Sequence, residues 1–172
     1  EIVKVIYGIH DMAEVSMTYT VHADGAIEVS ERMSDTGKLS ELPFMLRFGV
    51  ELAMPGEYTI LDFYGKGPFE TYEDRQSSAM VGRYFQRVED QYHYGYARPQ
   101  ESGAHTGLRW FRIFDEGGNG LEFTSLETFS ANALPFSRKD IDLSRDSYRR
   151  HSLELKRLAC ENHRSDGATY LN

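Results

Sequence analysis

The sequence predicts an all-β protein, an antiparallel sandwich with few short helices, from three observations. Apolar and polar residues alternate along most of the chain, which is typical of strands that bury one face. At two places this alternation flanks a tight-turn signal, Asp24-Gly25 and the glycine-rich segment 117–120, as in β-hairpins. Helical start signals are few and short. Because no linker, repeat or change of composition divides the 172 residues, we expect one sandwich domain over residues 1–172.

The first hairpin is expected between residues 15 and 30. Val15 and Met17 alternate with polar residues before the Asp-Gly turn, and Ile27 and Val29 do so after it. Glycine accepts the positive φ that a tight primed turn requires, so this is the clearest hairpin signal in the chain. The same alternation predicts further strands in the segments 42–54, 58–65, 81–88, 108–126 (a second hairpin) and 148–157.

Two short helical segments are expected. Ser137 with Asp140 three residues later resembles a capping box, in which each side chain bonds to the other's backbone N–H. In the segment 68–78, Pro68 would take the first helical position, with acidic residues in the first turn. The sequence therefore predicts one or two turns of helix at each place.

Charge and composition disfavour several classes of function. The net charge is −8 and no long basic run occurs, which argues against nucleic acid as a partner. No apolar run approaches the roughly 20 residues of a membrane-spanning helix, so no membrane is expected as a partner. The single cysteine, Cys160, allows neither an internal disulfide nor a cysteine-built zinc site, and it does not decide the compartment. Because both ends of the chain are strand-like, we expect a domain truncated at each end.

The segment 64–75, YGKGPFETYEDR, raises the question of catalysis because it holds three carboxylates, Glu70, Glu73 and Asp74. Glycoside hydrolysis does use two carboxyl groups, but they flank one bond across a cleft. Neighbours on a single turn would crowd on one side of a sugar, and Arg75 is placed to pair with them. We interpret the cluster as a structural corner and assign no catalytic residue to it.

Other catalytic or metal-binding patterns are weak. The six histidines are scattered, without the close spacing of a metal site, so no metal ligands are assigned. No G-x-S-x-G motif occurs, and His163 three residues after Cys160 is no evidence for a nucleophile and its base. Among the histidines, His105 is the best candidate for a ligand role, because its loop is rich in polar groups.

The loop over residues 90–110 is the best candidate for binding. Its tyrosines at 92, 94 and 96 alternate and are followed by planar polar side chains. Aromatic faces together with such groups are how proteins hold carbohydrate. The alternative is that the tyrosines cover one face of a sheet, with their hydroxyls in water. The candidate carbohydrate contacts are Tyr94, Arg98, Glu101 and His105.

Three ordered motifs carry a resemblance that covers roughly residues 10–172. The first, G-x-G-P-x-E-x-Y-x-D-R, is matched by Gly65, Gly67, Pro68, Glu70, Tyr72, Asp74 and Arg75. The second, Y-x-x-P-x-E-(N/S)-G with a later arginine, is matched by Tyr96, Pro99, Glu101, Ser102, Gly103 and Arg109. The third is FSANALPFSRKDID at 129–142. Together they resemble the C-terminal, small-chain type domain of bacterial β-galactosidases of glycoside hydrolase family 2.

The resemblance implies a galactose-mutarotase-like supersandwich that belongs to a larger retaining β-galactosidase. It implies that the catalytic glutamates lie in a separate barrel domain, and that this chain alone is inactive. No cofactor is expected in the chain itself, since the Mg and Na ions of the family bind outside these motifs. The implied partners are the parent's other domains, its β-galactoside substrate and further copies in a homo-oligomer, in a bacterial cytoplasm or periplasm. The family's sugar-contacting tryptophan cannot be carried over, because Trp110 does not match its motif.

The functional expectation is therefore a non-catalytic fragment that contributes structure, assembly and carbohydrate contact to a β-galactosidase. Two alternatives stay open at this point. One is a stand-alone carbohydrate-binding module that acts through the tyrosine-rich loop. The other is a mutarotase-like domain, which would need a general acid and a general base on opposite sides of an anomeric centre.

Overall fold

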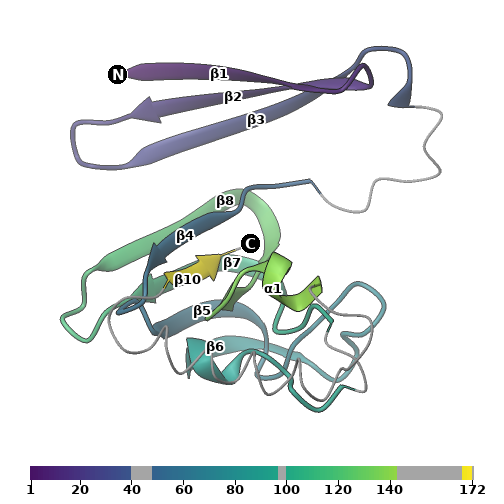
Figure 1. Cartoon of the computed structure of the whole chain (residues 1–172). Helices are drawn as coiled ribbons and strands as arrows, with labels where there is room; N and C mark the ends of the chain where they lie inside the picture. Colours follow the sequence, from purple (N-terminus) through teal and green to yellow (C-terminus); the bar gives the residue numbers. More distant parts are fainter. Residues whose placement is uncertain (40–47, 97–99, 143–167, 172) are drawn as a thin grey trace. The chain divides into compact units, whose positions relative to one another are not determined.

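The computed structural model describes residues 1–39, 48–96, 100–142 and 168–171 (Figure 1). The chain divides into two compact units, Glu1–Val50 and Glu51–Asn172. Both are built almost entirely from antiparallel strands, which confirms the all-β prediction. Over the described residues no helix has the length and apolar character needed to cross a membrane.

The first unit is a three-stranded antiparallel sheet in the order β1-β2-β3. Its strands are β1 (Ile2–Ile9), β2 (Ala13–Val21) and β3 (Ile27–Asp35). Val21 pairs with Ile27, and Gly25 in the turn has φ +91°, so the expected Asp-Gly hairpin is confirmed. On β2 the alternation buries Ala13, Val15 and Met17.

The second unit contains two antiparallel sheets. The four-stranded sheet has the order β6-β5-β7-β8, with β5 (Ile60–Gly67), β6 (Met80–Arg87), β7 (His105–Phe114) and β8 (Gly120–Ala131). The three-stranded sheet has the order β4-β10-β9, with β4 (Leu52–Pro55), β9 (Ala133–Leu134) and β10 (Ala168–Leu171). A 3-10 helix, η2 (Val88–Asp90), follows β6, and a short helix, α1 (Arg138–Asp142), follows β9.

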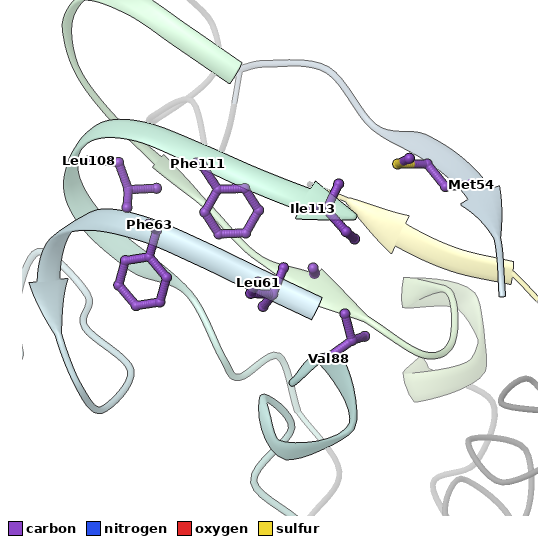
Figure 2. Packing of buried hydrophobic residues seen from close by; sticks show 8 residues of the cluster. Met54, Leu61, Phe63, Val88, Leu108, Phe111 and Ile113 are labelled. Carbon is purple, nitrogen blue, oxygen red and sulfur yellow. The ribbon is translucent and has the colours of Figure 1, made fainter. Parts of the chain in front are cut away.

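The core of the second unit lies between its two sheets (Figure 2). Alternation on β5 and β7 turns large side chains to the same face, where Phe63 pairs in register with Phe111. Met54 of β4 and Ala133 of β9 pack into this cluster from the other sheet, so the arrangement is the expected sandwich. Burying each such large side chain stabilises the fold by about 1.5–3 kcal/mol.

The second hairpin is also confirmed. β7 and β8 pair antiparallel, and Phe114 lies opposite Gly120 at the turn. The Asp115 carboxylate accepts a hydrogen bond from the Asn119 backbone N–H at 2.9 Å, and Gly118 has φ +83°. A register shift between His105 and Trp110 marks a bulge where β7 begins.

Of the two helical predictions, one is confirmed and one is wrong. Helix α1 begins directly after Ser137, whose backbone N–H donates to the Asp140 carboxylate at 2.8 Å, as in a capping box. The segment 68–78 is not helical: it follows a cis Gly67–Pro68 peptide and makes a tight turn closed by Tyr72 and Arg75.

The reason for the missing helix lies in its backbone partners. The Thr71 N–H donates to the Ala104 carbonyl at 2.7 Å, and the Tyr72 and Arg75 backbones bond to each other. These groups are therefore not available for the i to i−4 bonds of a helix.

The remaining strand predictions have different outcomes. Residues 48–51 are not in a strand, and β4 begins only at Leu52, while the rest of the predicted strand up to 47 lies outside the described residues. The predicted strand at 148–157 also lies outside them. The tyrosine-rich stretch that starts at Gln91 contains no strand among its described residues, so these tyrosines do not cover a sheet face.

Candidate functional site

An open hollow of about 710 Å³ lies in the second unit, beside the edge strand β6. Its walls come from separate parts of the sequence: the corner 68–75, the end of β6, the segment 90–96 and the start of β7. Both motifs of the sequence contribute to it, since Glu70 and Arg75 of the first and Tyr96 and Gly103 of the second line the same space. This hollow is the candidate functional site.

Glu70 holds the two motifs together. Its carboxylate accepts a hydrogen bond from the Arg75 guanidinium at 2.7 Å and one from the buried Gly103 backbone N–H at 2.7 Å. The Tyr96 hydroxyl donates to the same carboxylate. Burial and the Glu70 carboxylate raise the pKa of Tyr96, so the phenol keeps the proton that it donates. A carboxylate held in this way anchors a corner, because its lone pairs already point at protein donors.

Arg75 completes the corner from outside. Its guanidinium lies 5.4 Å from the centre of the Tyr72 ring and 5.8 Å from that of Tyr96, within cation–π range. The other two acids of the segment, Glu73 and Asp74, are exposed. Glu70 and Arg75 therefore pin the corner, whereas Asp74 points to solvent.

His105 forms the floor of the hollow and is part of the core. Its side chain is 1% exposed and stacks on Phe63 with 4.2 Å between ring centres. Burial lowers its pKa to about 4, although the nearby Lys66 carbonyl opposes this. At neutral pH the ring is therefore uncharged.

A chain of side-chain amides fixes which ring nitrogen of His105 carries the proton. Gln86 donates to the Pro68 carbonyl at 2.7 Å, so its own oxygen must face Gln91. Gln91 donates to that oxygen at 2.9 Å, which leaves the Gln91 oxygen 2.9 Å from Nε2 of His105. An amide oxygen can only accept, so the shorter of the two ring contacts places the proton on Nε2, which donates to Gln91, while Nδ1 lies 3.3 Å from the Lys66 carbonyl oxygen.

This buried neutral histidine predicts a loss of stability in acid. Between the unfolded pKa of 6.5 and the folded value of about 4, the unfolded chain binds a proton that the folded chain does not. The free energy of unfolding should therefore fall by roughly 3 kcal/mol as the pH drops through that window. Urea unfolding at pH 7 and pH 4, followed by Trp110 fluorescence, measures the change.

Two variants separate His105 from other acid effects. His105→Gln should remove most of this pH dependence, because glutamine can still donate to Gln91 but does not titrate. His93→Gln, which changes an exposed histidine of the same hollow, should leave it in place. The same pH dependence in wild type and His105→Gln would show that His105 is not the cause.

The chain matches a protein-family model described as the β-galactosidase small chain over residues 1–168. It belongs to this family. It is 38% identical over 152 residues to a β-galactosidase of Streptococcus thermophilus, which covers 85% of the chain and 14% of that protein. It is 36% identical over 130 residues to a β-galactosidase of Lactobacillus delbrueckii subsp. bulgaricus, covering 75% of the chain and 12% of the relative. The chain thus spans less than one-sixth of the length of these relatives.

In this β-galactosidase small-chain domain, the predicted carbohydrate contacts are spread over different surroundings. Of the three that the structure describes, His105 lines the hollow and the other two do not. Tyr94 is partly buried and packs edge-on against Tyr92 at 4.9 Å, next to Phe136. Glu101 is partly buried and is not a lining residue, and Arg98 lies outside the described residues.

The two glycines of the first motif have a packing role. Gly65 lies inside β5, and Gly67 is its last residue. A Cβ on Gly65 would come within 2.7 Å of the Leu108 side chain, and one on Gly67 within 2.8 Å of the Tyr84 ring. In this small-chain domain the absence of side chains at Gly65 and Gly67 lets neighbouring strands bring Leu108 and Tyr84 against β5.

Several lining residues were not predicted from the sequence. Phe69 and Phe85 lie on the hollow with 74% and 67% of their surface exposed. Phe69 lies inside the first motif, but nothing in the sequence showed that its side chain would be exposed. No sequence pattern indicated that Gln86 and Gln91 would line the site. Across the described part of this β-galactosidase domain, no group of three or more metal-ligating side chains is gathered.

Proposed function

We propose that this chain is a non-catalytic part of a retaining β-galactosidase, and that hydrolysis of terminal β-galactosides takes place elsewhere in the parent enzyme. Its membership of the β-galactosidase small-chain family and its short span of the relatives support this. The observation that carries it is the state of Glu70. A retaining glycosidase needs two carboxyl groups about 5–5.5 Å apart, free to meet the sugar from either side. The Glu70 carboxylate instead accepts hydrogen bonds from Arg75, Tyr96 and Gly103.

The role that remains is structural. A sandwich that packs against other domains would stabilise the parent and its assembly into a homo-oligomer. The Mg and Na ions implied by the family resemblance would then bind in other parts of the parent. Contact with carbohydrate, through the hollow, is the second part of the proposal. It is supported by aromatic and polar side chains that face the same space.

The purified chain should not hydrolyse a chromogenic β-galactoside. Its rate is expected to equal the buffer blank at every pH between 5 and 8 and at all chain concentrations, because no pair of free carboxylates among the described residues faces the hollow. The control is a β-galactosidase such as that of Streptococcus thermophilus, assayed in the same buffer. A rate that rises in proportion to the chain and survives repeated purification would overturn the proposal.

A further inference from the structure

We propose that the hollow is a binding site for one neutral pyranose ring, of the galactose type, stacked on Phe69 and Phe85. This rests on the proposed carbohydrate contact and assigns it a place, a set of contacts and a sugar class. It does not depend on where hydrolysis takes place.

Two exposed aromatic side chains line the hollow. Phe69 and Phe85 are 74% and 67% exposed, so their rings are open to a ligand. Both line the hollow, and they come from different segments, the corner and β6. Phe85 is held in place by an edge-on contact with Phe114 at 6.0 Å. Two aromatic rings at one hollow give the apolar surface on which the C–H groups of a sugar stack.

The charge of the hollow selects a neutral ligand. Its charged lining residues are two arginines and two carboxylates, Arg75 and Arg87 against Glu70 and Asp90, so the formal charge is zero with the histidines neutral. Most of these charges are already paired: Arg75 binds Glu70, and Arg87 binds Glu89 and Glu116. A phosphate or a sugar acid would meet no surplus of positive charge here.

Polar groups that can bind hydroxyls remain at the same hollow. Asp90 and His93 are exposed, and within the described residues neither side chain has a hydrogen-bond partner. The His93 ring is oriented by an edge-on contact with Tyr96 at 4.5 Å. A carboxylate accepts hydrogen bonds from sugar hydroxyls, and an imidazole can donate or accept one.

The wall behind these groups is rigid before any ligand arrives. Glu70 ties the corner to Gly103, and the amides of Gln86 and Gln91 link the corner to His105. A site whose supporting side chains are already fixed loses little conformational entropy on binding. The polar wall of the hollow is therefore held in place before a sugar binds.

Galactose stacks on the rings of Phe69 and Phe85 better than glucose does. Its axial 4-hydroxyl leaves the hydrogens on C3, C4 and C5 on one face of the ring, which forms one apolar patch. In glucose the corresponding hydrogens are divided between the two faces. An aromatic ring stacks on one face of a sugar and therefore favours the sugar whose apolar surface is gathered on one face.

Titration of the purified chain with methyl β-D-galactopyranoside, followed by NMR, tests the proposal. We expect saturable shifts with a dissociation constant on the order of 1 mM. Phe69→Ala and Phe85→Ala should each weaken binding about tenfold, since each removes one stacking surface. Both side chains are exposed, so these variants should fold.

The matched control is Leu126→Ala, which removes an exposed apolar side chain from β8, at the opposite edge of the same sheet. Its affinity should equal that of the wild type. Methyl β-D-glucopyranoside should bind at least about threefold more weakly. No saturable shift at high millimolar sugar, or binding that neither phenylalanine variant affects, would overturn the site. Equal affinity for both sugars would overturn the assigned class. None of these results bears on hydrolysis, which the chromogenic assay tests separately.

Discussion

Replacing Gly103 with alanine is expected to lower the free energy of unfolding of the second unit by about 3 kcal/mol. Gly103 has φ +81°, a conformation that costs an alanine roughly 1–2 kcal/mol. The larger part of the effect is steric. A Cβ at this position would lie 2.5 Å from the Gln91 carbonyl oxygen, which is backbone and cannot rotate away. The two segments would have to separate, and this would strain the Gln91–His105 and Gly103–Glu70 hydrogen bonds.

Gly118→Ala is the matched control for this prediction. Gly118 has φ +83°, nearly the same as Gly103, but a Cβ there would meet nothing within 4 Å. It should therefore cost only the backbone term, about 1 kcal/mol. Urea unfolding followed by the fluorescence of Trp110, the only tryptophan in the chain, reports on the second unit in both variants. Equal losses in the two variants would show that close packing at Gly103 is not limiting.

Replacing Glu70 with alanine has the second large expected effect, also about 3 kcal/mol. The loss leaves the buried Gly103 N–H without its acceptor and takes partners away from Tyr96 and Arg75. An unsatisfied buried donor alone costs about 1–3 kcal/mol. The same unfolding measurement gives the change.

Glu73→Ala controls for the loss of a carboxylate charge in the same turn. Glu73 is exposed and lies three residues from Glu70, so its removal changes the net charge equally without freeing a buried donor. We expect a change within about 0.5 kcal/mol. If Glu73→Ala were as destabilising as Glu70→Ala, the anchor assigned to Glu70 would be wrong.

The sequence predicted those parts of the fold that depend on neighbouring residues. Both hairpins and the cap at Ser137 follow from a few residues in sequence, and the structure confirms them. Such features need no knowledge of distant segments.

The helix expected at 68–78 was wrong for the opposite reason. Its first-turn signals are genuine, but Thr71 bonds to Ala104, a residue more than thirty positions away. A tertiary partner for the backbone outweighed the local preference. No pattern within the segment could have shown that partner.

Only part of the candidate site could be predicted from the sequence, for a similar reason. The two motifs were recognisable one at a time, and Glu70 had been grouped with its neighbours in sequence, Glu73 and Asp74. Its actual partners, Tyr96 and Gly103, are 26 and 33 residues away. The exposure of Phe69 and Phe85 likewise depends on how the corner meets the edge of the sheet. These relations exist only after the chain has folded.

The central claim is that Glu70 is an anchor that joins the two motifs, and a double-mutant cycle between Glu70 and Tyr96 tests it most directly. Unfolding free energies are measured for the wild type, Glu70→Ala, Tyr96→Phe and the double variant. Because the Tyr96 hydroxyl donates to the Glu70 carboxylate, the losses should not add, and we predict a coupling of about 1–2 kcal/mol. Losses that add to within about 0.3 kcal/mol would contradict the claim, since they would show that the two motifs are stabilised independently.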